Sequence, residues 1–168
     1  MKKQGVVWVS TVLYILISLA VLAIVLVAVQ PRIDAVRDKA TIDQTVNMLN
    51  ELDQKIIEVD NSAQGNVRSL NLQIKKGTLI VDENKIQWQF RSSYKYSEPN
   101  RHVKIGRIDS YTTKVPRGFN VLLTLDYEGN VILVSEFESL QPAETPYKIF
   151  IKNSGSMNGL NKIIIYST

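Results

Sequence analysis

Residues 6–29 carry no charged side chain and have the sequence VVWVSTVLYILISLAVLAIVLVAV. Ser10, Thr11 and Ser18 are their only strongly polar members. As an α-helix that rises about 1.5 Å per residue, this segment is roughly 36 Å long, enough to cross the hydrocarbon layer of a bilayer. The three hydroxyl groups can bond to carbonyls one turn earlier, so such a helix leaves no polar group unsatisfied in lipid. The segment therefore predicts a membrane-spanning helix.

A secretory signal peptide is the alternative reading of this N-terminus. Lys2 and Lys3 form a basic start, and residues 18–20 resemble a weak cleavage site of small residues. The apolar segment is, however, longer than the roughly 7–15 residues of a signal peptide, and no clear cleavage site follows it. We therefore favour a retained helix. Its orientation is not predicted, because basic groups are equally numerous on both sides.

An amphipathic pattern continues the helix from Pro31 to about Asp60, and Pro31 is expected to kink it. The apolar stripe comprises Ile33, Val36, Ala40, Ile42, Val46, Leu49, Leu52, Ile56 and Val59. The expected solvent-facing side comprises Asp34, Asp38, Asp43, Gln44, Asn47, Asn50, Asp53 and Gln54. Residues 61–66 are expected to end the helix, with Gly65 as a left-handed cap. A helix of roughly 80 Å exceeds what one globular domain needs, so other molecules must cover its first half.

After residue 67 the apolar pattern alternates with a period of two, which is typical of half-buried strands. The expected strands are residues 70–74, 78–81, 86–90, 93–97, 101–109, 120–127, 131–137, 147–152 and 162–167. We interpret residues 154–156 as a loop. The sequence thus predicts an α+β fold: a long N-terminal helix, with an apolar and an amphipathic half, packed on a C-terminal antiparallel β-sandwich-like domain of residues 67–168. Helix residues expected to pack on this domain are Ile42, Val46, Leu49, Ile56 and Val59.

Composition excludes much catalytic chemistry. The 168 residues contain no cysteine and a single histidine, His102, so disulfides, thiolate nucleophiles and multi-histidine metal sites are excluded. Residues 82–84 have the chemistry of a turn rather than of a calcium site, and the sequence has no phosphate-binding glycine loop or serine-hydrolase motif. We therefore predict no enzymatic activity, no metal and no cofactor.

A basic strip lies within the expected β-domain, in a chain whose net charge is +4. Its members are Lys85, Arg91, Lys95, Arg101, Lys104 and Arg107. Interleaved aromatic residues make the strip a candidate contact for an anionic surface or a nucleic acid. The alternation places Trp88 and Phe90 inward, away from any ligand, so a solvated face is favoured and nucleic-acid binding is not expected.

The order of these parts resembles the type IV pilin superfamily. Lys2, Lys3, Gln4 and Gly5 precede the apolar helix as a short basic leader, residues 1–5. Bacterial pilins usually carry a glutamate early in the helix, whereas here the first acid is Asp34, so the archaeal pilin and archaellin branch fits better. The resemblance implies that a prepilin peptidase cuts after Gly5, and cleavage after Lys3 is the alternative.

The resemblance also implies a structural subunit of an extracellular filament for adhesion or motility. Residues 6–30 would lie in the membrane before assembly and in the filament core afterwards, among identical subunits. Expected interface residues are Val6, Val9, Val12, Leu13, Leu16, Ile17, Leu19, Val21, Ile24 and Val27. An assembly ATPase and a platform protein are implied partners. The alternative hypotheses are a monomeric, membrane-anchored β-ectodomain that binds a ligand and, less favoured, a secreted enzyme.

Overall fold

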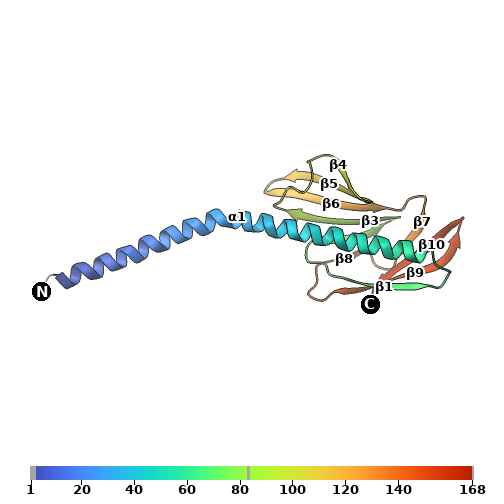
Figure 1. Ribbon diagram of the computed structural model, residues 1–168, viewed down its shortest axis with the longest axis horizontal. Helices are drawn as coiled ribbons and strands as arrows, with labels where there is room; N and C mark the ends of the chain where they lie inside the picture. Colours follow the sequence, from blue (N-terminus) through green and yellow to red (C-terminus); the bar gives the residue numbers. More distant parts are fainter. Residues whose placement is uncertain (1–2, 83, 168) are drawn as a thin grey trace.

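The computed structural model describes residues 3–82 and 84–167. One long helix, α1 (Lys3–Asp60), precedes a β-domain of strands, as Figure 1 shows. The strands are β1 (Val67–Leu72), β2 (Thr78–Asp82), β3 (Lys85–Ser92), β4 (His102–Ile105), β5 (Ile108–Val115), β6 (Gly118–Asp126), β7 (Val131–Ser135), β8 (Ser139–Leu140), β9 (Tyr147–Met157) and β10 (Leu160–Ser167). The α+β architecture predicted from the sequence is confirmed.

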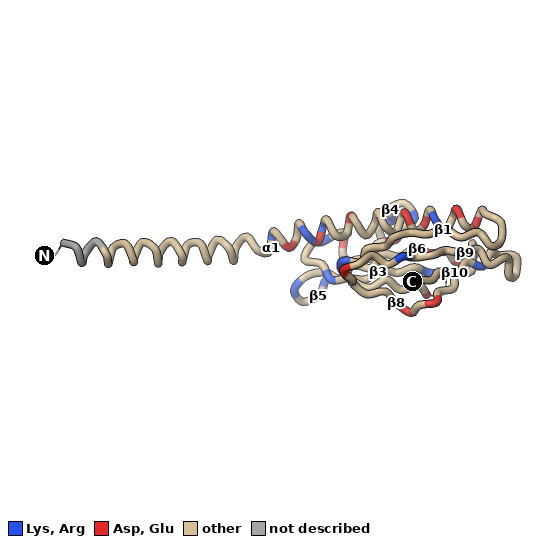
Figure 2. The backbone as a smooth tube through the Cα atoms, turned by 90° about the horizontal axis from the view of Figure 1, so that it is seen from below, with Lys and Arg blue, Asp and Glu red and all other residues tan. Residues whose placement is uncertain are grey.

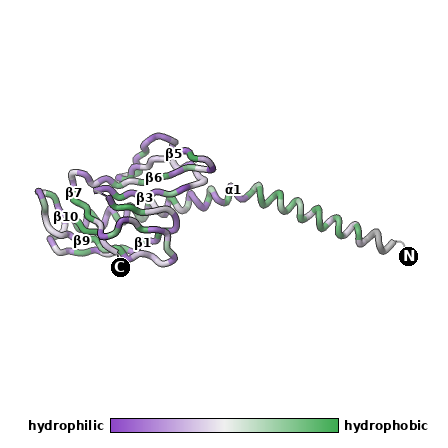
Figure 3. Tube along the Cα trace, turned by 180° about the vertical axis from the view of Figure 1, so that it is seen from behind, coloured by the Kyte–Doolittle hydropathy of each residue, from purple (hydrophilic) through white to green (hydrophobic). Residues whose placement is uncertain are grey.

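The helix has two halves with different surroundings. Its apolar half projects away from the β-domain, and its second half lies along the strands (Figures 1 and 3). Figure 1 shows a change of direction about midway along α1, and Pro31 lies inside the helix. Proline has no N–H for the carbonyl four residues earlier, and its ring crowds that carbonyl. We attribute the bend to this missing bond.

Two sheets make up the β-domain. One has the strand order β1-β9-β10-β7 and the other the order β4-β5-β6-β3-β2-β8. Among the described strands, every pair is antiparallel except that of β7 with β10, which is parallel. The chain leaves β7, adds β8 to the other sheet and returns through β9 before it forms β10. No hairpin links β7 to β10, so the direction of this pair is free to differ from the expected antiparallel one.

The core lies between the second half of α1 and the inner faces of both sheets. Ile42, Leu49 and Val59 of the helix are fully buried. Trp88 of β3 is 1% exposed, and its indole N–H donates a 3.0 Å hydrogen bond to the carbonyl of Lys76. Each fully buried Leu, Ile or Val side chain contributes about 1.5–3 kcal/mol, so this interface holds the helix firmly on the sheets.

The helix stripe differs from the expected one at both its apolar and its polar positions. Ile33 and Val36 are exposed, whereas Asp38 and Asp53 are buried. Successive apolar residues are mostly three or four positions apart, which suggests that they share one face. At about 100° per residue, however, Ile33 lies roughly 180° around the helix from Ile42. The two aspartates lie four residues from buried Ile42 and Leu49, on the same side of the helix. Angular position therefore decided burial, and residue type did not.

Three expectations about strands were wrong. Residues 93–97 form a loop instead of a strand, and residues 101–109 form a hairpin of β4 and β5 that turns at Gly106, whose φ is +61°. Residues 154–156 lie within β9 instead of a loop. There Gly155, with a φ of +98°, accompanies a shift of register against β10, which is the geometry of a β-bulge.

The end of α1 is held by the sheet that follows it. The side-chain amide of Asn161 donates to the carbonyl of Asp60 at 2.9 Å, and that of Asn153 donates to the carbonyls of Val59 and Ser62. Gly65 has a positive φ, +89°, but it lies five residues beyond Asp60 and its N–H donates to the carbonyl of Asn153, so it does not form the expected cap of the helix. Carbonyls left free at a helix end need such partners, so β9 and β10 fix where α1 stops.

Candidate functional site

The apolar half of α1 is the largest exposed apolar surface that the described residues present. Every residue from 11 to 33 is exposed, and the exposed fraction of the large hydrophobic residues in this stretch ranges from 40% at Ile33 to 76% at Val27. These side chains surround the whole circumference of the helix. Figure 3, coloured by hydropathy, shows the apolar half of α1 as a continuous hydrophobic arm. The hydroxyl of Ser18 donates a 2.8 Å hydrogen bond to the carbonyl of Tyr14, one turn earlier, so the helix satisfies this polar group internally.

This arm is long and apolar enough to cross a membrane, by length and composition. A signal sequence near an N-terminus would pass the same test, so the observation is weak evidence for a membrane anchor. Leaving this surface in water would forfeit about 1.5–3 kcal/mol for each large apolar side chain, or tens of kcal/mol in all. We infer that lipid or protein covers it.

Most of the sequence-predicted interface residues lie on this arm. The exposed ones are Val9, Val12, Leu13, Leu16, Ile17, Leu19, Val21, Ile24 and Val27. Lys2 lies outside the described residues, and the surroundings of Lys3, Gln4, Gly5 and Val6 are likewise not described. The five residues expected to pack on the β-domain lie in its core; they are Ile42, Val46, Leu49, Ile56 and Val59.

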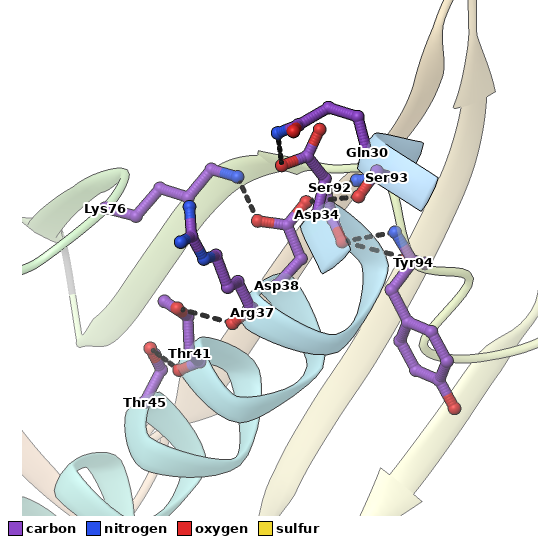
Figure 4. A network of polar contacts seen from close by, with 10 residues as sticks. All are labelled: Gln30, Asp34, Arg37, Asp38, Thr41, Thr45, Lys76, Ser92, Ser93 and Tyr94. Atoms are coloured by element: carbon purple, nitrogen blue, oxygen red, sulfur yellow. Dashed lines mark hydrogen bonds and ion pairs between the residues drawn. The ribbon is translucent and has the colours of Figure 1, made fainter. Parts of the chain in front are cut away.

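An ionic cluster fixes α1 to the β-domain where the helix first meets the strands (Figure 4). Asp38 is 9% exposed, and it accepts hydrogen bonds from the backbone N–H of Ser93 at 2.6 Å and from its hydroxyl at 2.7 Å. Its other carboxylate oxygen accepts a hydrogen bond from the ammonium group of Lys76. We call Asp38, Lys76 and Ser93 the Asp38 cluster. It ties the helix to two loops that follow β1 and β3.

The Asp38 cluster also keeps its carboxylate charged. Burial raises the pKa of Asp38, but hydrogen bonds from Lys76 and Ser93 outweigh it, so the pKa lies below that of an ordinary aspartate. A charged Asp38 accepts hydrogen bonds from all three donors. A protonated Asp38 would instead point its own O–H donor at one of them. The cluster is therefore intact at neutral pH.

A second polar contact lies further along α1. The hydroxyl of Tyr127 donates to Asp53 at 2.6 Å, and the guanidinium of Arg107 lies 3.5 Å from the same carboxylate oxygen. Arg107 also lies over the ring of Tyr127, 5.3 Å from its centroid. Burial and the hydrogen bond to Asp53 raise the pKa of Tyr127. This arrangement provides hydrogen-bond and ionic partners for the buried carboxylate of Asp53, and its role is to stabilise the fold.

The structure divides the basic strip. Lys85 pairs with Asp126 and Glu128, Arg101 with Glu98, and Arg107 with Asp53, so these three cations are already partnered. The remaining members Arg91, Lys95 and Lys104 are exposed. Trp88 and Phe90 face inward, as the alternation predicted. The strip is therefore a mixture of structural ion pairs and free cations, and it does not form a stacking platform for bases.

His102 lies on the exposed surface of β4 and contacts two residues of the neighbouring strand β5. Its side chain stacks on Tyr111, with ring centroids 4.6 Å apart, and its Nδ1 lies 2.5 Å from Asp109. Within residues 3–82 and 84–167, no three His, Cys, Asp or Glu side chains gather in a geometry that could hold a metal ion.

Sequence reasoning missed the two buried aspartates, although a signal was available. Asp38 and Asp53 occupy the buried side of the helix by angle, and a charged residue there needs partners from the opposing strands. Their partners Lys76, Ser93 and Tyr127 come from separate loops, which no local pattern connects. No protein-family model, no curated protein and no solved structure matches this chain.

Proposed function

We propose that this chain is the structural subunit of an extracellular filament of the type IV pilin kind, polymerised through the apolar half of α1. The observation that carries the proposal is the exposed apolar surface around the whole circumference of this helix. A filament core surrounds each helix with copies of itself, and such a core needs apolar side chains on all sides. The proposed role is structural rather than catalytic.

The attachment of α1 to the β-domain supports the proposal. The buried helix face, the Asp38 cluster and the capping of Asp60 by Asn161 hold the second half of α1 along its length. When the apolar half moves from lipid into a filament, the β-domain must follow as one body. A rigid attachment would place every β-domain on the filament surface in the same orientation.

Exchange of lipid contacts for helix contacts gains little hydrophobic energy, because lipid is as apolar as a neighbouring helix. Close packing must therefore provide the specificity of assembly. A bulky substitution that lipid accommodates can still prevent helices from packing. We expect Val12→Phe to abolish filaments while the protein stays in the membrane. Leu16→Asp and Val21→Asp should abolish filaments as well.

The test begins with intact cells that are sheared to release surface material. The released material is pelleted and imaged, and the intact mass of this chain is measured within it. Filaments that contain the chain support the proposal, and a chain shortened beside Gly5 would also locate leader cleavage. Membrane fractionation of Val12→Phe is the control, because this variant should remain anchored.

Two outcomes would contradict the proposal. Filaments at normal density in Val12→Phe cells would mean that the arm does not pack specifically. A wild-type protein that stays with the membrane and yields no filament would leave the monomeric, membrane-anchored β-ectodomain as the better hypothesis.

A further inference from the structure

Free cations gather at the end of the β-domain from which the apolar half of α1 projects. We call this the proximal end and define it as residues 32–43 of α1 with the loops and adjoining strand ends 73–77, 91–97, 114–118 and 141–146. Figure 2 shows Lys and Arg positions on the helix and on the loops beside β5 at this end. Sequence separation hides the grouping, because the loops are spread over some seventy residues.

The strand register brings these loops together. Ser92 at the end of β3 pairs with Phe119, and Val115 at the end of β5 pairs with Gly118, so the loops 91–97 and 114–118 leave the sheet at the same end. Asp38 joins this end to the helix through Lys76 and Ser93. The loop 141–146 borders it, because the N–H of residue 143 donates to the carbonyl of residue 74 at 3.1 Å.

The proximal end has a strong charge imbalance. Its basic residues are Arg32, Arg37, Lys39, Lys75, Lys76, Arg91, Lys95, Lys114 and Arg117, and its acidic residues are Asp34, Asp38, Asp43 and Glu144. Nine cations against four anions give this end +5, more than the +4 of the entire chain. The rest of the chain is thus close to neutral.

Ion pairing accentuates the imbalance. Lys76 is bound to Asp38, but the other eight cations have no acidic group within 4 Å among the residues that the structure describes. All eight are exposed. Away from the proximal end, Lys55, Arg68 and Lys85 each pair with an acid. Lys104, Lys148, Lys152 and Lys162 lie elsewhere and also lack an acidic partner, so the proximal end holds eight of the twelve described cations without one.

This end lies close to the boundary of the apolar arm. From Val29 to Asp38 the helix rises about 14 Å, at roughly 1.5 Å per residue. The headgroup layer on one side of a bilayer is about 5–8 Å thick. If the hydrocarbon ends near Val29, the proximal loops stand within about 10 Å of the headgroups, which is comparable to the Debye length at physiological salt. Long Lys and Arg side chains shorten this gap further.

We propose that the proximal end is a binding surface for the anionic headgroups of the bilayer that α1 spans. Charge complementarity and position select this partner, because phosphate groups are the nearest fixed anions to eight unpaired cations. The inference requires that the apolar half lies in a membrane, and it holds whether or not the chain later polymerises. The surface would enrich anionic lipid around the anchor and hold the β-domain against the membrane.

The test uses the full chain in nanodiscs of phosphatidylcholine. The sequence contains no cysteine, so Pro116→Cys, in the exposed turn between β5 and β6, provides a single site for a fluorescent donor. A trace lipid carries the acceptor on its acyl chain and has either a phosphatidylglycerol or a phosphatidylcholine headgroup. At about 0.1 M salt we expect at least twofold more energy transfer to the anionic lipid. At 1 M salt, where the Debye length is about 3 Å, the ratio should fall to near one.

Two charge-matched triple variants localise the effect. Lys95→Gln, Lys114→Gln and Arg117→Gln remove three charges from the proximal end, and at least half of the enrichment should be lost. Lys104→Gln, Lys152→Gln and Lys162→Gln remove three charges elsewhere, and the enrichment should persist. Tryptophan fluorescence in a Trp8→Phe background, where it reports buried Trp88 alone, verifies that each variant is folded.

The result that overturns the proposal is equal transfer to the two lipids in the wild type. An equal loss of anionic-lipid enrichment in both triple variants would overturn the proposal too, because the enrichment would then depend on the net charge of the chain and not on this surface. The nanodisc holds an unassembled chain, so neither result depends on filament formation. The shear experiment can therefore fail while this one succeeds, and the reverse also holds.

Discussion

Asp38→Asn tests how the helix is attached to the β-domain. Asp38 is 9% exposed, and its carboxylate accepts hydrogen bonds from Lys76 and twice from Ser93. An asparagine amide in its place would present an N–H₂ group to at least one of these donors. The side chain of Lys76 is 39% exposed, so we assign its pair only about 0–1 kcal/mol. Hydrogen bonds to a buried charge are worth about 1.5–3 kcal/mol. We expect a loss of about 2–4 kcal/mol of unfolding free energy.

The assay is thermal unfolding of the chain in detergent micelles, followed by tryptophan fluorescence in a Trp8→Phe background, so that the signal comes from Trp88, which is 1% exposed. In a chain of 168 residues, the expected loss corresponds to a Tm lowered by roughly 5–12 °C. Asp34→Asn is the matched control, one turn earlier on the helix. Asp34 accepts a single hydrogen bond, from Gln30 at 3.2 Å, so its loss should change stability by less than about 0.5 kcal/mol.

The effect should also depend on pH. The folded pKa of Asp38 lies below the unfolded value of about 3.9. Its stabilisation is therefore complete above about pH 4 and is lost as the pH falls toward the folded pKa. The difference between wild type and Asp38→Asn should shrink as the pH falls below about 4. A difference below about 0.5 kcal/mol at pH 7, or one that does not shrink in acid, would refute this account.

Further predictions concern two other positions. Tyr127→Phe removes the 2.6 Å hydrogen bond to Asp53 and should cost about 1.5–3 kcal/mol in chemical unfolding, whereas Tyr147→Phe, which loses an exposed bond, should cost less than about 1 kcal/mol. Because the pKa of Tyr127 is raised, the wild type should also lose stability above about pH 10, and the phenylalanine variant should lose less. Gly77→Ala would place a Cβ 2.4 Å from the carbonyl oxygen of Gln89, and we expect a loss of more than about 2 kcal/mol. Gly129→Ala meets nothing within 4 Å, so only its positive φ should cost stability, about 1 kcal/mol; equal losses in both variants would contradict the steric argument.

The apolar arm and the alternating strands were predictable because both depend on local patterns. Residues 6–29 contain enough uncharged length for a spanning helix, and a period of two places Trp88 and Phe90 on one face of β3. The strand boundaries were less predictable. Gly106 divides residues 101–109 into a hairpin because its positive φ allows a tight turn, and neighbouring β-like residues conceal that turn.

The sequence determined which half of the helix is apolar and which part of the chain forms sheets, because helix and strand periodicities are properties of neighbouring residues. Only the tertiary structure decided the partners of Asp38 and Asp53, since these partners come from loops and strands far away in the chain. The basic surface has the same origin. Lys95, Lys114 and Arg117 meet at the proximal end because strand register brings their loops together, and no linear pattern encodes that register.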